Sequence, residues 1–355
     1  MTIVAHAYEY VIGIDTHARS HTLAIRVAST GQSVGSDTFP ATPAGMARAI
    51  AWAGRRTGGE ADTLWVIEGV GSYGAALAAA VRDAGYPVVE APRMSARDRR
   101  GLGKSDPLDA AAIAAAALPI ELDRLRQPRT DVGIRAGLRV LVAARDQMTA
   151  ERTGQVNALT ALVRVVDLGL DARRPLTTAQ IAQITRWRPR TEQIERRVAR
   201  AEAVRLARRI TALDTELTDN EHEMTQLLHA SQAAPLLDET GIGPVTAAVV
   251  LCAWSHPGRV RSAAAFASLA GVNPIPASSG NTTRHRLNRG GDRRLNQALH
   301  MAVITRTAHD PATRDYIARR TTTDGKTRRD ARRCLKRYLA RHLYRRLNDL
   351  YATTT

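Results

Sequence analysis

The chain has 355 residues, of which 44% are hydrophobic, and this size suggests two or three domains that each form a core. Its longest apolar stretch, residues 110–120, is too short for a membrane span, and the two cysteines lack the spacing of a disulfide framework or a zinc site, so we expect a soluble cytoplasmic protein. The formal net charge is +17, and a soluble protein with that excess binds polyanions such as nucleic acids.

The amino-terminal part predicts a mixed β-sheet with helices. Its strand patterns lie at residues 10–15, 21–28, 31–41, 63–69 and 87–91, and helical patterns separate the last three at 43–56 and 72–84. The first three strands follow one another directly and predict an antiparallel meander. The later alternation of strands and helices implies parallel pairing through right-handed crossovers. A meander followed by a βαβ continuation is the strand plan of the ribonuclease H-like fold.

From about residue 131 the strand patterns give way to helical ones. Apolar residues at helical spacing predict one long amphipathic helix that reaches residue 166, and a shorter helix follows at 177–187. Residues 190–234 contain neither Gly nor Pro, and their heptad-like seam indicates a coiled coil in which Asn220 is a polar core position. An isolated helix this charged is marginally stable. We therefore expect it to pack against the earlier helix or another subunit, as a stalk that supports oligomers.

Two glycines mark a turn in the carboxy-terminal part. Gly241 and Gly243 flank Ile242, and the pattern predicts a helical hairpin with a helix on either side of this turn. Glycines at such a helix start let backbone N–H groups approach a phosphate, as in helix-hairpin-helix DNA-binding elements. The alternative is a plain tight turn between two core helices.

Basic residues are concentrated in the last fifth of the chain. Between Arg284 and Arg346 there are nineteen Lys or Arg residues and five Asp or Glu residues. A loop rich in small residues is expected before two basic helices, the second spanning residues 328–351. Tyrosines interspersed in this region could stack on bases, although a solvated basic face remains the alternative. The candidate nucleic-acid-binding residues nearest the loop are Arg284, Arg286, Arg289, Arg293 and Arg294.

Four acidic residues stand at the ends of predicted elements. Asp15 ends the first strand and Glu68 the fourth, and these strands are neighbours in a ribonuclease H-like sheet. Asp106 and Asp109 lie three residues apart at a helix start, so they share one face. Four converging carboxylates repel one another unless a cation binds, and their oxygens suit Mg²⁺. Taken alone, Asp106 is equally compatible with a role as a helix cap. Nearby His17 and His21 are interpreted as surface or packing residues in preference to ligands.

Several motifs, collectively specific, resemble those of one family. They are "GIDTHARSH", "VIEGVGSYG", "KSDPLDA", "GIGPVTA", "FASLAGVNPIPASSG" and "NRGGDRRLNQAL" in this order. The chain thus resembles the insertion sequence 110 transposases, which are DEDD-type recombinases guided by a bridge RNA. The resemblance covers nearly the whole chain.

The resemblance implies three domains. They are a RuvC-like nuclease domain at residues 1–125, a helical coiled-coil region at 126–235 and a basic transposase domain at 236–355. It further implies that the four carboxylates form a catalytic tetrad that holds Mg²⁺. An essential serine of the family falls on Ser279, with Ser278 as the alternative. Many members continue with Gly-Lys after this Ser-Gly, whereas Asn281 and Thr282 follow here, so a role for that lysine does not carry over.

The predicted function is a recombinase that cuts and rejoins DNA to move an insertion sequence. Its expected partners are the element ends and target DNA, a guide RNA and further copies of the chain, in a dimer or tetramer. A non-catalytic nucleic-acid-binding protein is one alternative. An actin-like phosphotransferase is the other, but its second sheet and later phosphate loop find no counterpart in the sequence.

Overall fold

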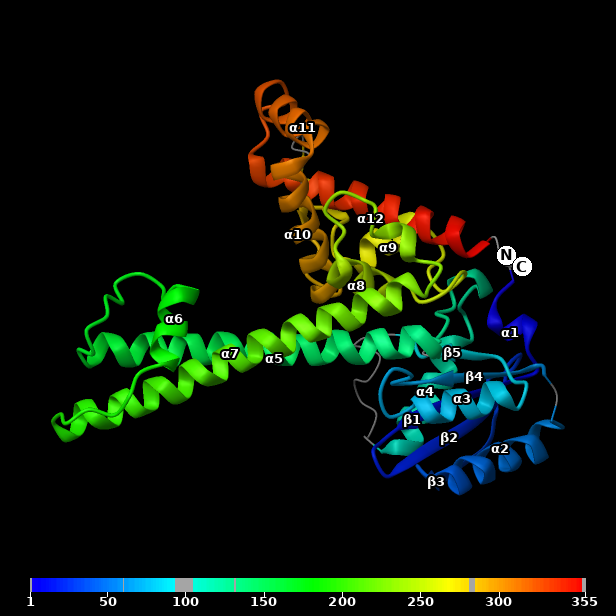
Figure 1. Ribbon diagram of the computed structural model, residues 1–355. Coiled ribbons are helices and arrows are strands. Elements are labelled where there is room, and N and C mark those ends of the chain that lie inside the picture. Colours follow the sequence, from blue (N-terminus) through cyan, green and yellow to red (C-terminus); the bar gives the residue numbers. More distant parts are fainter. Residues whose placement is uncertain (1, 60, 93–104, 131, 281–284, 353–355) are drawn as a thin grey trace. The chain divides into compact units, whose positions relative to one another are not determined.

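The structure is a computed structural model that describes residues 2–59, 61–92, 105–130, 132–280 and 285–352 (Figure 1). The chain divides into two units, one formed by Met1–Thr130 with Trp254–Phe266 and the other by Asp131–Ala253 with Ala267–Thr355. Among the described residues, no helix combines the length and the apolar character that crossing a membrane requires.

A mixed five-stranded sheet forms the centre of the first unit. Its strands are β1 (Tyr10–Thr16), β2 (Ser20–Val27), β3 (Ser33–Pro40), β4 (Thr63–Ile67) and β5 (Val88–Glu90). The order is β3-β2-β1-β4-β5, with β1 antiparallel to β2 and parallel to β4. The predicted meander and the predicted pairing of the first and fourth strands are thus confirmed, since Ile14 pairs with Ile67.

Helices cover both faces of this sheet. On one face, α2 (Pro43–Thr57) and α3 (Ala75–Asp83) pack on side chains such as Ile12 and Trp65. On the other face, α4 (Asp106–Ala117) packs its buried Ile113 against Val11 and its neighbours. The short elements α1 (Val4–Ala7) and η1 (Leu122–Arg124) also belong to this unit. The amino-terminal start of α4 lies over the sheet on the second face.

The second unit is mostly helical. Its elements are α5 (Gly133–Val165), α6 (Thr178–Thr185), α7 (Ile194–His229), η2 (Ala234–Leu236), α8 (Pro244–Trp254), α9 (Ala263–Leu269), β6 (Pro274–Pro276), β7 (His285–Leu287), α10 (Arg293–His309), α11 (Pro311–Thr322) and α12 (Arg328–Ala352), of which α8 and α9 run into the residues of the first unit. The predicted long helix that reaches residue 166 is confirmed by α5, and the predicted long helix within residues 190–234 is confirmed by α7. The basic helix predicted at 328–351 is confirmed by α12.

The two longest helices, α5 and α7, lie side by side and run antiparallel (Figure 1). Asn220 is 6% exposed, and its Nδ2 donates to the carbonyl oxygen of Leu141 at 3.1 Å. Nearer the other end of the pair, Arg209 Nε donates to Glu151 Oε1 at 2.7 Å. Of the two partners that the sequence left open for the α7 seam, the earlier helix covers it at Asn220.

Two local predictions in the carboxy-terminal part are wrong. The first helix of the predicted hairpin is only the single 3-10 turn η2, because Pro235 and Gly241 leave too few residues between them for a helix. The segment predicted as a loop contains β6 and β7, which pair in antiparallel fashion. Pro274 and Pro276 obscured this strand, since proline is compatible only with strands that have an unpaired edge.

Candidate functional site

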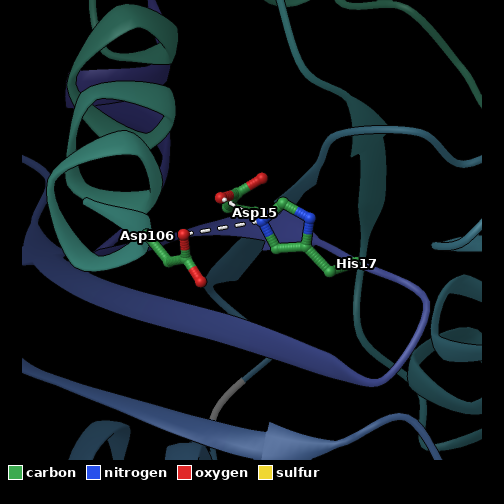
Figure 2. Close-up of side chains that lie close together, drawn as sticks. All are labelled: Asp15, His17 and Asp106. Carbon is green, nitrogen blue, oxygen red and sulfur yellow. Dashed lines mark ion pairs between the residues drawn. The ribbon is translucent and has the colours of Figure 1, made fainter. Parts of the chain in front are cut away.

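Asp15 is the centre of the candidate site. It is the penultimate residue of β1, and its side chain is 11% exposed. His17 Nε2 lies 3.2 Å from Asp15 Oδ2 and 3.6 Å from Asp106 Oδ1, so the imidazole stands between two carboxylates (Figure 2). The ligand atoms of these three residues all lie within 4.8 Å of one another. The end of β1 and the start of α4 therefore form one polar cluster.

A close approach of helix to strand brings Asp106 to this place. Gly13 in β1 faces α4, and a Cβ atom at this position would lie 2.1 Å from the carbonyl oxygen of Ala110. From the next strand, Arg26 Nε donates to the carbonyl oxygen of Ala111 at 3.1 Å. These contacts hold the first turns of α4 against the sheet. Only glycine at position 13 allows that distance.

The electrostatics of the cluster are those of crowded carboxylates. Burial raises the pKa of Asp15, and the negative charges of Asp106 and Asp109 raise it further, whereas His17 acts in the opposite direction. The ionised form of Asp15 is thus disfavoured by its surroundings. A bound cation would offset both the cost of burying the charged carboxylate and the repulsion between the carboxylates. The cluster therefore has the chemistry of a cation site.

Glu68 and Asp109 stand nearby but are not part of the three-residue cluster. Glu68 follows β4, where its N–H donates to the carbonyl oxygen of Ile14 at 3.0 Å and its carbonyl oxygen accepts from Thr16 Oγ1 at 2.9 Å. Its residue is exposed. Asp109 lies one turn along α4 from Asp106 and acts on Asp15 through its charge. Their membership of a metal-binding tetrad stays a prediction.

His17, predicted to be a surface or packing residue, is instead a member of the polar cluster. Residues two apart at a strand end point to the same face, so the spacing of Asp15 and His17 already places their side chains together. His21 behaves as a packing residue instead. It lies in β2, is 2% exposed, and its Nδ1 has no hydrogen-bond partner among the described residues. Burial, followed by the nearby charge of His17, lowers the pKa of His21.

The predicted nucleophile lies in the second unit, after strand β6. Ser278 and Ser279 are both exposed, and Gly280 follows with φ +54°. The base of the β6–β7 hairpin is well defined, because Asn288 Nδ2 donates to Asn273 Oδ1 at 2.7 Å. Asn281, Thr282 and Arg284 fall outside the described residues. The hairpin thus presents Ser279 to solvent on a fixed base.

The predicted basic residues divide into two groups. Arg286, Arg289 and Arg293 are exposed on or beyond β7. Arg294 is exposed as well, but its guanidinium forms an ion pair with Asp146 of α5. The charge of Arg294 is therefore already compensated within the second unit.

The glycine turn packs on α10. Gly241 has φ +82°, and a Cβ atom there would lie 2.7 Å from the carbonyl oxygen of Ala302. Arg306 Nε donates to the carbonyl oxygen of Thr240 at 2.7 Å. Packing alone therefore accounts for Gly241, as the tight-turn alternative expects. Gly243 is exposed, with no atom near its missing Cβ, so approach of a phosphate is open only there.

Comparison with known families identifies two matching regions. Residues 12–166 match the model of the DEDD-type IS110 transposases, described as a transposase. Residues 233–318 match the transposase family named for IS116, IS110 and IS902. The first region contains all four predicted acids, and the second contains Ser279.

Three relatives from insertion elements are similar over most of their length. The IS900 uncharacterized 42 kDa protein of Mycobacterium paratuberculosis is 28% identical over 339 residues, covering 82% of both chains. The IS110 uncharacterized 43.6 kDa protein of Streptomyces coelicolor is 28% identical, covering 81% of this chain and 82% of the relative. The IS116 uncharacterized 44.8 kDa protein of Streptomyces clavuligerus is 25% identical, covering 87% of both. With both domain models and full-length relatives in agreement, this chain belongs to the IS110 family of transposases.

Proposed function

We propose that this transposase cuts and rejoins DNA with metal-binding carboxylates and a serine nucleophile. Asp15, Glu68, Asp106 and Asp109 would hold Mg²⁺, and Ser279 would attack the strand. The observation that carries the proposal is the buried carboxyl group of Asp15, which faces Asp106 across His17 at the start of α4. Such an arrangement stores repulsion that a divalent cation removes.

The residues present fit a hard divalent cation. Carboxylate oxygens are the donors that Mg²⁺ prefers, and three of the four acids already interact electrostatically. The imidazole of His17 is a better ligand for transition metals, so we assign it to orienting Asp15. When bound, the ion would promote deprotonation of the attacking group and stabilise negative charge on the leaving oxygen.

The serine step conserves the phosphodiester bond energy. Ser279 Oγ would bond to phosphorus as the bond to the leaving DNA oxygen breaks; the serine proton passes to a base and the leaving oxygen gains a proton. Reversal by a different DNA hydroxyl rejoins the strand without ATP. The exposed guanidinium groups of Arg286 and Arg289, and that of Arg284, would stabilise charge on the phosphoryl oxygens.

The finer points of fold and partners belong to the same proposal. The sheet order β3-β2-β1-β4-β5 supports a ribonuclease H-like, RuvC-like nuclease domain at residues 1–125. The antiparallel α5–α7 pair supports a coiled-coil region at 126–235, ahead of a transposase domain at 236–355. A guide RNA is proposed from the family resemblance, and a dimer or tetramer from the long helical pair.

The proposal is tested by cleavage of DNA that carries the element ends. Wild-type protein, with RNA that co-purifies with it, is expected to cut in Mg²⁺ and not in EDTA. Asp15→Asn should abolish cutting. Asp37→Asn, an equal loss of charge at an exposed position on β3, should leave cutting unchanged. Cleavage by Asp15→Asn at the wild-type rate would refute the metal site.

A further inference from the structure

Helices α10 and α12 enclose a group of basic side chains that neither the acids nor the serine hairpin accounts for. Asn296 and His300 on α10 face Arg332 and Lys336 on α12, and we refer to these four residues as the α10–α12 cluster. The two helices pack against each other (orange and red in Figure 1). The residues of each pair are four apart and so lie on one helix face. Lys336 Nζ donates to Asn296 Oδ1 at 2.9 Å.

The positive charges in this cluster are not balanced by carboxylates. Lys336 and Arg332 are both half-buried, and no carboxylate in the described ranges lies within ion-pair distance of either. The Nε of Arg332 is buried without a hydrogen-bond partner in that same part of the chain. The adjacent Arg333, by contrast, is paired with Asp330 at 2.9 Å. A partly buried ammonium and an uncompensated guanidinium that both act on His300 are costly for the protein alone.

Burial, and after it nearby positive charge, disfavours the protonated forms of two members of the cluster. Burial lowers the pKa of Lys336, and the charge of Arg333 lowers it further. Burial also lowers the pKa of His300, followed by the charges of Lys336 and Arg332. All of these groups would be stabilised in their protonated forms by an anion. The surroundings of the cluster therefore lack one negative partner.

We propose that the α10–α12 cluster binds a phosphate group of a nucleic-acid backbone. Phosphate oxygens accept hydrogen bonds from ammonium and guanidinium groups and supply the missing negative charge. This inference rests on the proposed function, because the bound strand is taken to be one that the transposase handles. The proposed phosphate contact lies at the α10–α12 cluster, where positive charges repel one another in the free protein.

The cluster is connected to the base of the serine hairpin. Asn296 accepts from Lys336 through Oδ1 and donates through Nδ2 to the carbonyl oxygen of Ala270 at 2.7 Å. Ala270 precedes Gly271, whose backbone packs so closely on Gly291 that a Cβ atom on Gly291 would lie 2.2 Å from Gly271 N. A phosphate held by Lys336 would thus be fixed relative to the segment that carries Ser279. The cluster would act as a positioning contact for the strand.

The test is the salt dependence of binding by the full-length protein, measured in EDTA so that strands stay intact. A DNA duplex and an RNA of equal phosphate number serve as probes. Lys336→Gln and Arg332→Gln should each reduce the slope of log K against log salt by about 1, because each removes a phosphate contact. Arg345→Gln, an equal loss of charge at an exposed position of the same helix, should not. The probe whose slope falls identifies the bound strand as DNA or RNA.

Thermal unfolding without nucleic acid separates binding from a structural role. Since the free protein tolerates repulsion here, both variants should unfold at the wild-type temperature or above it. Unchanged slopes on both probes, an equal loss in Arg345→Gln, or a fall in unfolding temperature that parallels the loss of binding would each overturn the inference. If wild-type protein itself bound neither probe, the proposed function would fail as well, which distinguishes the two failures.

Discussion

Gly13 of β1 lies directly against Ala110 of α4, and a Cβ atom at position 13 would lie 2.1 Å from the carbonyl oxygen of Ala110. Gly13→Ala should therefore push α4 away from the sheet and displace Asp106 from Asp15. We expect a loss of stability of about 1–3 kcal/mol, as in other overpacked cores, and a larger loss of cleavage than of nucleic-acid binding. Urea unfolding and a cleavage assay check both.

The control for Gly13→Ala is Gly35→Ala on β3. A Cβ atom at Gly35 would meet its nearest neighbour at 3.6 Å, which is an ordinary contact. This variant should keep wild-type stability and cleavage. Equal effects of the two substitutions would show that the close approach of α4 does not position the acids.

Mg²⁺ should stabilise the folded protein through the four acids. Because burial and the charges of Asp106 and Asp109 raise the pKa of Asp15, its ionised form opposes folding near neutral pH in the absence of metal. Asp15→Asn should therefore be as stable as wild type or more stable without metal. Mg²⁺ should raise the unfolding temperature of wild type and leave that of Asp15→Asn unchanged. An equal Mg²⁺ response in both proteins would place the ion elsewhere.

Glu68, Asp106 and Asp109 should be as necessary for strand cleavage as Asp15. Glu68→Gln, Asp106→Asn and Asp109→Asn are each expected to abolish strand cleavage and to retain nucleic-acid binding, because they remove metal ligands and no basic contact. Gel-shift and cleavage assays on the same preparations separate the two effects. Wild-type cleavage by any two of the three variants would contradict the tetrad.

Arg293 and Arg294 should differ in nucleic-acid binding although they are neighbours. Arg294 is already paired with Asp146, whereas Arg293 is exposed and forms no ion pair with a described residue. Arg293→Gln should lower the slope of log K against log salt by about 1, and Arg294→Gln should lower it less. Stability should change by less than about 1 kcal/mol for both, because Arg294 loses only an exposed ion pair and Arg293 is an exposed residue. The opposite order of slopes would mean that Arg294 leaves Asp146 to bind the strand.

Asn220 should contribute measurably to the stability of the helical pair of α5 and α7. Asn220→Ala removes a buried hydrogen bond to Leu141 and a longer one from Arg145 Nη1, so we expect a loss of about 1–3 kcal/mol in urea unfolding. The neighbouring exposed Asp219→Ala should stay within about 0.5 kcal/mol of wild type. A neutral Asn220→Ala would show that the apolar seam alone holds the two helices.

The periodicity of the apolar residues and the order of the predicted elements along the chain made most of the fold predictable. The strands of the meander and the βαβ continuation have clear apolar patterns, and the pairing of β1 with β4 places Glu68 beside the end of the strand that carries Asp15. The contribution of Gly13 cannot be predicted in this way, because a glycine within a strand does not indicate which helix will approach it. The spacing of Asp15 and His17 and the start of α4 at Asp106 follow from local patterns, but the approach of Asp106 to His17 depends on how α4 packs on the sheet, which is a tertiary contact.

The carboxy-terminal part was harder to predict for a physical reason. The β6–β7 hairpin is short and proline-containing, and the contacts at its base come from Gly271, Gly291 and asparagine side chains with no periodicity. The ion pair of Arg294 with Asp146 joins residues far apart in the chain, so sequence alone could not distinguish Arg294 from the other arginines.

The central claim is that the acids enable Ser279 to attack DNA, and the most direct measurement is to map the protein–DNA adduct by mass spectrometry. Wild-type protein incubated with element-end DNA in Mg²⁺ should yield one adduct, attached at Ser279, and the adduct should be absent in EDTA and in Asp106→Asn. An adduct at Ser278 would move the nucleophile by one residue. Ser279→Ala protein that still forms an adduct and recombines DNA would contradict the account.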